Sequence, residues 1–118
     1  MKEIEHRIQR RNNLNQVVYE DVQGPGNGRH HYAIERDGET LCDIQFQNGP
    51  RNEEGSIPGV VEADLLEIVR HRLQCFQAGP YATVENACAL AHIEEALMWM
   101  NKRVEDRAER GVLGTMKK

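Results

Sequence analysis

Three arginines and a tryptophan near the end of the sequence have the types and spacing of a phosphate-binding surface. Arg103, Arg107 and Arg110 follow at i, i+4 and i+7, so they share one stripe of a helix that turns about 100° per residue. Trp99 lies one turn before them. Guanidinium groups donate paired hydrogen bonds to phosphate oxygens, and an indole offers a flat stacking surface. The alternative is pairing along the helix with acidic neighbours, namely Asp106, Glu109 or Glu95.

A second candidate surface lies at an expected turn between two helices. Phe76 and Tyr81 flank a rigid corner formed by Gly79 and Pro80, although the whole chain contains only six aromatic residues (two Phe, three Tyr and one Trp). The two rings can close the end of a hydrophobic core or stack on a flat base. Asn86 follows on the apolar stripe of the next helix, where a buried amide must be hydrogen-bonded. It can brace the turn, or it can bind the edge of a base or ribose.

Catalytic and metal-binding motifs are absent from the sequence. It contains no CxxC pair, no HExxH, no GxxxxGK[ST] loop and no GxGxxG turn. The pair His30 and His31 precedes an expected strand, and nothing else at metal-ligand spacing joins it, so we interpret it as sheet surface. We therefore expect no catalytic residues, no metal site and no cofactor.

The charge is unevenly distributed along the chain. The net charge is −4, but residues 1–100 carry 9 Lys and Arg against 16 Asp and Glu, whereas residues 101–118 carry 6 against 3. An acidic body disfavours binding along DNA, which needs an extended basic surface. A basic end suits a compact anion, although basic residues also suit a solvated helix C-terminus.

Location and redox state are predicted from what the sequence lacks. No run approaches the roughly 18 apolar residues that span a bilayer, and the charged N-terminus lacks the apolar core of a signal peptide. We expect a cytoplasmic protein without membrane contact. The three cysteines, Cys42, Cys75 and Cys88, are widely spaced among apolar neighbours, so we expect reduced residues in the core.

The first half of the chain is expected to form an antiparallel sheet. Residues 16–22, 31–35 and 41–46 are rich in β-branched or alternating apolar residues. Asp37-Gly38 between the last two runs is a strong hairpin signal. In the last run Cys42, Ile44 and Phe46 share one face, which indicates a half-buried strand. Residues 48–60 form a long loop, and long loops tend to be functional.

The second half is expected to form a helical hairpin. Apolar residues recur at helical spacing before Gly79-Pro80, at Leu65, Leu66, Val69, Leu73 and Phe76. A longer helix is predicted from about Thr83 to Arg110, with Gly111 as its stop. Its core stripe comprises Leu90, Ile93, Leu97, Met100, Val104 and Ala108.

The prediction is an α+β protein of one domain, residues 1–118, with a β-rich part over about 1–60 and the hairpin and tail over about 61–118. A chain this small has little room for an internal cavity, so a ligand site forms more easily between subunits.

Several segments together resemble the first type of phage Thoeris anti-defence proteins. These segments are Phe46–Pro50, Asp64–Val69, Phe76–Tyr81, Glu85-Asn86, Glu94–Trp99 and Arg107–Thr115. The helical hairpin is also similar to that of phage sponges that blunt cyclic-oligonucleotide (CBASS) immunity. The similarity covers roughly residues 41–118, and residues 1–40 fit only in their β-rich character.

The resemblance implies a sponge that sequesters a signal without cleaving it. In Thoeris immunity a TIR enzyme makes a glycocyclic ADP-ribose that activates an NAD-depleting effector, and the phage protein binds that signal intact. Family members assemble as dimers and hexamers, and some bind cyclic di- and trinucleotides at separate sites. The resemblance places Phe76 and Asn86 on cyclic ADP-ribose, with Arg103 near its phosphates. It adds further candidates for ligand contacts, namely Arg51, Pro80, Tyr81, Arg107, Arg110, Gly111 and Thr115.

This sequence departs from the family pattern at a few positions. Leu113 stands where relatives usually carry an acidic residue, and Met116 stands where they carry His. Before the first helix, Val61-Glu62 replaces a pair that more often caps the helix. These changes affect the terminal site and leave the hairpin turn intact. Two other classes of function stay open: a signal-degrading enzyme, and a protein that inhibits a host defence effector by direct contact.

Overall fold

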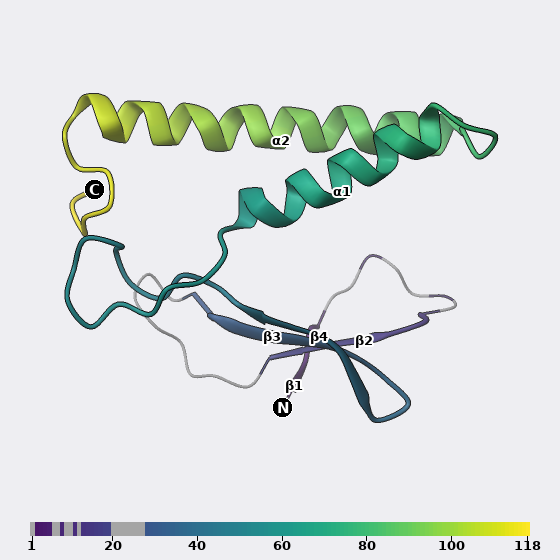
Figure 1. The fold of residues 1–118 in the computed structure, drawn as a ribbon, viewed down its shortest axis with the longest axis horizontal. Helices are drawn as coiled ribbons and strands as arrows, with labels where there is room; N and C mark the ends of the chain where they lie inside the picture. The colour runs from purple at the N-terminus through teal and green to yellow at the C-terminus, as the bar shows by residue number, and fades with distance from the viewer. Residues whose placement is uncertain (1, 6–7, 9–10, 12, 20–27) are drawn as a thin grey trace. The chain divides into compact units, whose positions relative to one another are not determined.

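The computed structural model describes residues 2–5, 8, 11, 13–19 and 28–118. The chain divides into two compact units, Met1–Val60 and Val61–Lys118. The first unit contains a four-stranded antiparallel sheet and the second contains two helices (Figure 1). The predicted α+β class, with an N-terminal sheet followed by a helical hairpin, is confirmed.

The sheet has its strands in sequence order. Strands β1 (Lys2–Glu3), β2 (Gln16–Tyr19), β3 (His31–Arg36) and β4 (Glu39–Gln45) pair in the order β1-β2-β3-β4, each antiparallel to its neighbour. β2 begins where the sequence predicts it. The rest of that expected strand, residues 20–22, and most of the glycine-rich segment that follows it lie outside the described residues.

The hairpin between β3 and β4 turns at the predicted dipeptide. Asp37 and Gly38 both have positive φ, 51° and 81°, which is the backbone of the tight turns that match the twist of two paired strands. Arg36 pairs with Glu39 directly across this turn. An irregularity between Ile34 and Glu35 then shifts the register by one residue, as a β-bulge does.

The buried centre of the described sheet consists of two apolar residues. Val18 and Ala33 are opposite each other in the register and are its buried apolar residues, at 5% and 1% exposure. On the other face, Tyr32 makes edge-to-face contacts with Tyr19 and Phe46, with ring centroids 6.3 and 5.6 Å apart. Aromatic pairs of this geometry stabilise a sheet face beyond their buried area.

The segment after β4 folds back on the sheet instead of forming an open loop. Phe46 bridges Val60 and Asn48 bridges Ile57, so residues 48–57 form an irregular hairpin. The amide of Gln45 donates to the carbonyl oxygens of His30 and Phe46. These bonds explain why Gln45 is half-buried, although it lies on the face of the strand opposite to Ile44 and Phe46.

Helix α1 spans Glu62–Gln77 and begins without a conventional cap. The N-cap residue is Val61, whose side chain has no hydrogen-bonding atom. The carboxylate of Asp64 instead accepts the Val61 N–H at 2.9 Å, which is the return half of a capping box. The helix ends before Gly79-Pro80, as predicted.

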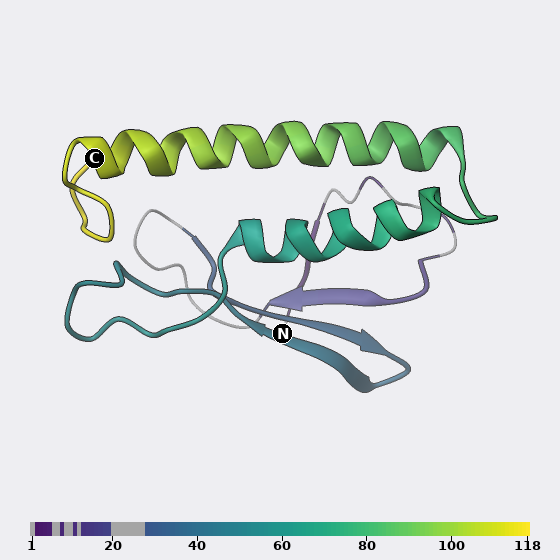
Figure 2. The same cartoon turned by 45° about the horizontal axis from the view of Figure 1, so that its top comes forward.

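Helix α2 spans Val84–Glu109 and runs back along α1 (Figures 1 and 2). The side chain of Thr83 caps it by accepting the Asn86 N–H at 3.0 Å. At its end, Gly111 adopts a φ of 72°, while Gly111 N–H donates to Ala108 and Val112 N–H to Arg107. These two bonds form a Schellman motif, so the predicted stop at Gly111 is confirmed.

The two helices contact each other along only part of α2. Arg70 of α1 donates to Glu94 of α2 at 3.0 Å. Leu90, Ile93, Leu97 and Met100 are half-buried, as the predicted stripe requires, but Val104 is 45% exposed and Ala108 is also exposed. The reason is length: at 1.5 Å per residue, the 16 residues of α1 span about 24 Å and the 26 of α2 about 39 Å.

The prediction of core cysteines is wrong. Cys42, Cys75 and Cys88 are free thiols, as expected, but all three are exposed. Within the described part of the sheet unit, no helix or second sheet covers Cys42. Cys75 and Cys88 lie on helix faces that the hairpin does not bury.

No helix among the described residues has the length and apolar character needed to cross a membrane.

Candidate nucleotide-binding surfaces of the helical hairpin

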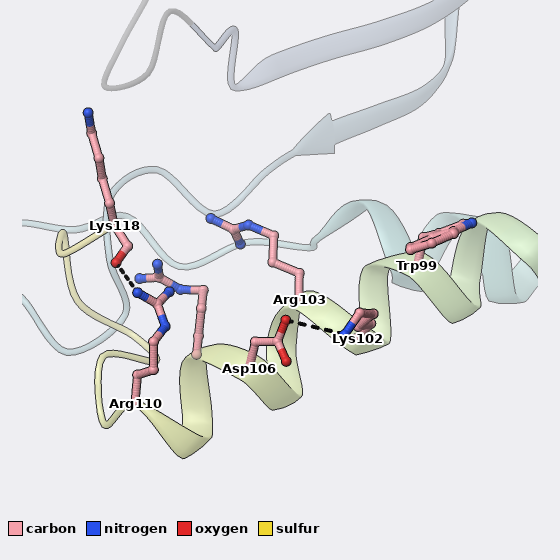
Figure 3. A pocket seen from close by; sticks show the side chains of 7 residues that line it. Trp99, Lys102, Arg103, Asp106, Arg110 and Lys118 are labelled. Atoms are coloured by element: carbon pink, nitrogen blue, oxygen red, sulfur yellow. Dashed lines mark hydrogen bonds and ion pairs between the residues drawn. The ribbon is translucent and has the colours of Figure 1, made fainter.

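The predicted arginine stripe forms a basic pocket at the C-terminal end of α2 (Figure 3). The pocket has a volume of about 480 Å³ and lies between the last turns of the helix and the tail. Its lining combines one indole, five basic side chains and one carboxylate: Trp99, Lys102, Arg103, Arg107, Arg110, Lys118 and Asp106. The helix thus brings together all four residues that the spacing singled out.

Arg107 has a structural role within this pocket. It is 8% exposed and is the buried charged residue of the described chain. Its Nη2 atom donates to the carbonyl oxygens of Val112 and Thr115, both at 3.0 Å. The Thr115 hydroxyl donates to the same Val112 oxygen at 2.6 Å. The guanidinium therefore holds the tail against the helix, and the predicted pairing with acidic helix neighbours is not what positions it.

The other basic side chains differ in what they contact. Lys102 pairs with Asp106 at 3.7 Å, and Arg110 donates to the Lys118 carbonyl oxygen at 2.6 Å (Figure 3). Arg103 is exposed and, among the residues that the structure describes, has no hydrogen bond or ion pair. Its five donors are thus available to an incoming anion.

The hairpin turn is held by a side chain that the sequence analysis did not single out. The Gln77 amide donates to the Thr83 carbonyl oxygen and accepts the Thr83 N–H, both at 3.0 Å. Bracing of the turn is one of the two roles that the sequence allows for Asn86. Only the backbone N–H of Asn86 contributes, through the Thr83 cap, so its half-buried amide side chain is not needed for that cap.

The aromatic residues of the turn are partly accessible. Phe76 is half-buried, while Pro80 and Tyr81 are exposed. The Arg72 guanidinium lies over the Phe76 ring, 5.2 Å from its centroid, in cation–π contact. Arg72 is a cation that the sequence analysis missed. The i, i+4 spacing between Arg72 and Phe76 could have indicated this contact, because residues at that spacing share one side of a helix.

The candidate residues occupy two places in one chain. Arg103 follows Asn86 by 17 positions of continuous helix, which is about 25 Å along the axis. Within one chain, a single small ligand cannot reach from the hairpin turn to the basic pocket. Arg51 lies in the other unit, exposed on the irregular hairpin after β4.

Lys102 and Lys118 also line the basic pocket and were not predicted. Lys102 follows Trp99 by three residues, so the same helical spacing places it beside the ring. Lys118 could not be found this way, because its position depends on how the tail folds.

The side chains that could suggest catalysis or metal binding form two separate pairs. His31 contacts Asp43 across the sheet, with Nε2 and Oδ1 2.6 Å apart. On α1, His71 and Cys75 lie one turn apart with a 4.0 Å contact, and both are exposed. In the described part of the chain, no three His, Cys, Asp or Glu side chains are grouped so as to hold a metal ion.

Comparison with known proteins identifies the family. Residues 38–105 match the model of the Acb2/Tad1 hairpin domain, a region that contains α1, the hairpin turn and most of α2. The chain is 47% identical over 78 residues to a protein named Thoeris anti-defense 1 from Bacillus phage SBSphiJ7. The aligned region covers 66% of this chain and 54% of that relative, so the chain spans about half the length of the curated relative it matches. The chain therefore belongs to the Acb2/Tad1 hairpin-domain family, which confirms its predicted relationship to phage Thoeris anti-defence proteins.

Proposed function

We propose that this protein is a phage anti-defence sponge that captures nucleotide immune signals and holds them without cleaving them. Its ligands are isomers of cyclic ADP-ribose, such as the glycocyclic ADP-ribose of Thoeris TIR enzymes, and cyclic di- and trinucleotides. It acts in the cytoplasm of the infected bacterial host. Membership of the hairpin-domain family and the name of the phage relative support this proposal.

The basic pocket of α2 is the observation that carries the proposal. It places an exposed indole within one helical turn of Arg103, on a chain whose net charge is negative. A cyclic nucleotide is compact, carries phosphates and presents flat bases. Trp99 supplies a stacking surface, and Arg103, Lys102 and Arg110 supply donors for phosphate oxygens. Phosphates of free nucleotides suit this pocket better than a DNA backbone, because its cations are confined to the end of α2 and the tail.

The hairpin turn forms the second ligand surface. Phe76 stacks on a base, Asn86 binds a base or ribose edge through its free amide, and Pro80 and Tyr81 form the rim. The positive charge of Arg72 beside the ring adds a phosphate partner. Arg51, Gly111 and Thr115 complete the set of ligand-contacting residues. The separation of the two surfaces within one chain supports two kinds of site, one for each class of signal.

The proposed sponge works as a homo-oligomer. Both surfaces are open to solvent, and a protein that holds its ligand tightly must bury most of the ligand surface. A second copy supplies the missing walls. The scarcity of buried apolar side chains among the described residues, limited to Val18 and Ala33, supports assembly of several copies.

Sequestration requires no catalytic residue. Binding energy comes from stacking and from charge-assisted hydrogen bonds, which the two surfaces supply without a general base, a nucleophile or a cofactor. The proposed protein is therefore not an enzyme, and its capacity is set by the number of its binding sites.

A capture-and-release assay tests the proposal. The purified protein is mixed with cyclic ADP-ribose isomers or cyclic oligonucleotides and separated from free ligand. The retained protein is then heated, and the released compound is identified by chromatography. The expected result is recovery of intact ligand in stoichiometric amount. Conversion of excess ligand would identify an enzyme. Retention of no nucleotide would refute the sponge and favour a protein that inhibits a host effector by direct contact.

A further inference from the structure

The amide side chain of Gln77 closes the turn between α1 and α2 (Figure 1). Gln77 is the last residue of α1, and Thr83 is the N-cap of α2. The Gln77 Nε2 atom donates to the Thr83 carbonyl oxygen, and the Gln77 Oε1 atom accepts the Thr83 N–H, each at 3.0 Å. We call these two hydrogen bonds the turn clamp.

The turn clamp uses both the length and the chemistry of the glutamine side chain. An amide offers a donor and an acceptor on neighbouring atoms, so it can satisfy the N–H and the carbonyl oxygen of one residue at once. Asparagine has the same two groups but is one methylene shorter. Methionine has the length of glutamine but has no donor and only a weak acceptor. Neither residue can therefore replace Gln77 in the clamp.

The turn clamp ends on the residue that caps α2. The Thr83 carbonyl oxygen also accepts the Ala87 N–H at 3.1 Å, and the Thr83 hydroxyl oxygen accepts the Asn86 N–H at 3.0 Å. The N–H, the carbonyl oxygen and the hydroxyl oxygen of Thr83 are thus all engaged. A shift of Thr83 would therefore also shift the first turn of α2, which carries Asn86.

Few other contacts hold this turn in the described part of the chain. Residues 79–82 are all exposed, so packing contributes little to their order. The Ala82 N–H donates within the turn at a long 3.4 Å. The hydrogen bond that joins the two helices from Arg70 to Glu94 lies seven positions before Gln77, which is about 10 Å along α1. The order of the turn therefore depends mainly on the clamp.

The residues that the turn clamp holds are those of the proposed ligand surface at the hairpin turn. Phe76 is the neighbour of Gln77 at the end of α1, and Asn86 lies in the first turn of α2. Pro80 and Tyr81 lie inside the loop that the clamp closes. Because Phe76 and Asn86 belong to different helices, their separation is set by the turn that joins them.

We propose that Gln77 is a positioning residue for the capture of cyclic ADP-ribose isomers. Through the turn clamp it holds Phe76 and Asn86 at the separation that the ligand requires, and it does not touch the ligand itself. A turn that is ordered before binding spares the ligand the free-energy cost of ordering it. Without the clamp, only the fraction of molecules with an ordered turn can bind, and the apparent affinity falls by that fraction. The inference rests on the proposed function and adds a residue that acts before the ligand arrives.

Calorimetry with variants of Gln77 tests the inference in the full chain. Gln77→Met keeps the length of the side chain, and Gln77→Asn keeps the amide but cannot reach Thr83. We expect both to bind glycocyclic ADP-ribose about five- to tenfold more weakly, as when roughly a fifth to a tenth of the molecules have an ordered turn. Gln74→Met is the matched control, because Gln74 is an exposed glutamine of the same helix, and it is expected to bind like the wild type. Circular dichroism checks that each variant is folded.

A second ligand tests whether the effect is local. Cyclic triadenylate is the probe for the basic pocket, which lies about 25 Å along α2 from Asn86. We expect the wild type and all three variants to bind it with the same affinity. Equal losses for the two ligands would mean that Gln77 supports the whole helical unit and would overturn its role at the turn.

Binding rates and hydrogen exchange separate positioning from direct contact with the ligand. A smaller ordered fraction lowers the association rate constant by the same factor, whereas a lost ligand contact raises the dissociation rate constant. Stopped-flow measurement gives both constants. The Thr83 amide proton reports the turn clamp directly. By nuclear magnetic resonance we expect it to exchange about tenfold faster in ligand-free Gln77→Met than in the wild type, because its acceptor is gone.

The outcomes distinguish failure of this inference from failure of the proposed function. Wild-type affinity in the folded Gln77→Met and Gln77→Asn proteins would overturn the role of Gln77 and leave the sponge in place. A loss confined to the dissociation rate constant would do the same. If both variants fail to fold, the wild type still decides: a Thr83 amide that exchanges as fast as an unprotected one would show that the clamp does not order the turn. Retention of no nucleotide by the wild type would refute the sponge, and with it the role of Gln77 in capture.

Discussion

Arg107 and Thr115 are joined across the end of α2, with the buried guanidinium donating to the Thr115 carbonyl oxygen at 3.0 Å. The same nitrogen donates to Val112, so one charged group satisfies two carbonyl oxygens of the tail. The tail forms one wall of the basic pocket through Lys118. The geometry of the pocket thus depends on a residue that the sequence indicated as a phosphate ligand or as a partner of acidic neighbours on the helix.

Replacement of Arg107 by alanine is expected to destabilise the helical unit. The change removes two hydrogen bonds from a charged donor and leaves the Thr115 carbonyl oxygen without its partner, which costs about 2–3 kcal/mol of unfolding free energy. Denaturant unfolding followed by circular dichroism measures the loss. Arg107→Lys is the matched variant and is expected to recover part of it. A stability equal to wild type in Arg107→Ala would contradict the role assigned to the guanidinium.

Replacement of Arg103 by alanine is expected to weaken capture without affecting stability. Arg103 is exposed and has no partner among the described residues, so its removal should change the unfolding free energy by less than about 0.5 kcal/mol. Loss of a charge-assisted bond to phosphate is worth about 1.5–3 kcal/mol, or roughly tenfold or more in affinity. Calorimetric titration with a cyclic nucleotide measures the change. Unaltered affinity would remove Arg103 from the site.

Substitutions at the hairpin turn are expected to abolish capture of cyclic ADP-ribose while the protein stays folded. Asn86→Ala removes the amide but keeps the backbone N–H that Thr83 accepts, so the helix cap survives. Phe76→Leu keeps apolar volume at a half-buried position and removes only the stacking surface. Binding is measured by calorimetry and folding by circular dichroism. Full binding by both variants would show that the turn is not the ligand site.

Gly59→Ala is expected to disrupt the sheet unit and to leave the helical hairpin of α1 and α2 intact. A Cβ at residue 59 would overlap the Gln45 carbonyl oxygen and the backbone of Phe46, which cannot move without breaking the bridge to Val60. Overpacking against backbone typically costs about 1–3 kcal/mol. Hydrogen exchange is expected to rise in residues 45–60 but not in α2. Gly55→Ala tests the alternative that any Cβ in this segment disrupts it. A Cβ at residue 55 meets nothing within 4 Å, so its only strain comes from the φ of 80° at this residue. We therefore expect a smaller effect from Gly55→Ala than from Gly59→Ala.

The local elements of this protein could be predicted from the sequence because each depends on neighbours in the chain. Asp37-Gly38 specified a tight turn, the apolar spacing specified α1, and Gly111 specified the end of α2. The spacing of Trp99 and Arg103 placed both on one side of a helix, which was enough to bring them into one pocket. The family followed from six segments between Phe46 and Thr115, among them the hairpin turn and the stretch Arg107–Thr115.

Only the tertiary structure decided what the individual side chains contact. Helical spacing cannot tell a buried arginine that binds the tail from an exposed one, so Arg107 and Arg103 had the same prediction. The burial of Val104 and the cysteines was predicted from apolar patterning, which assumes that every apolar stripe has a partner. Helix α1 is too short to cover the end of α2, so Val104 stays exposed there. Apolar patterning specifies that a surface should be buried, but the length and packing of the other elements decide whether one chain can bury it.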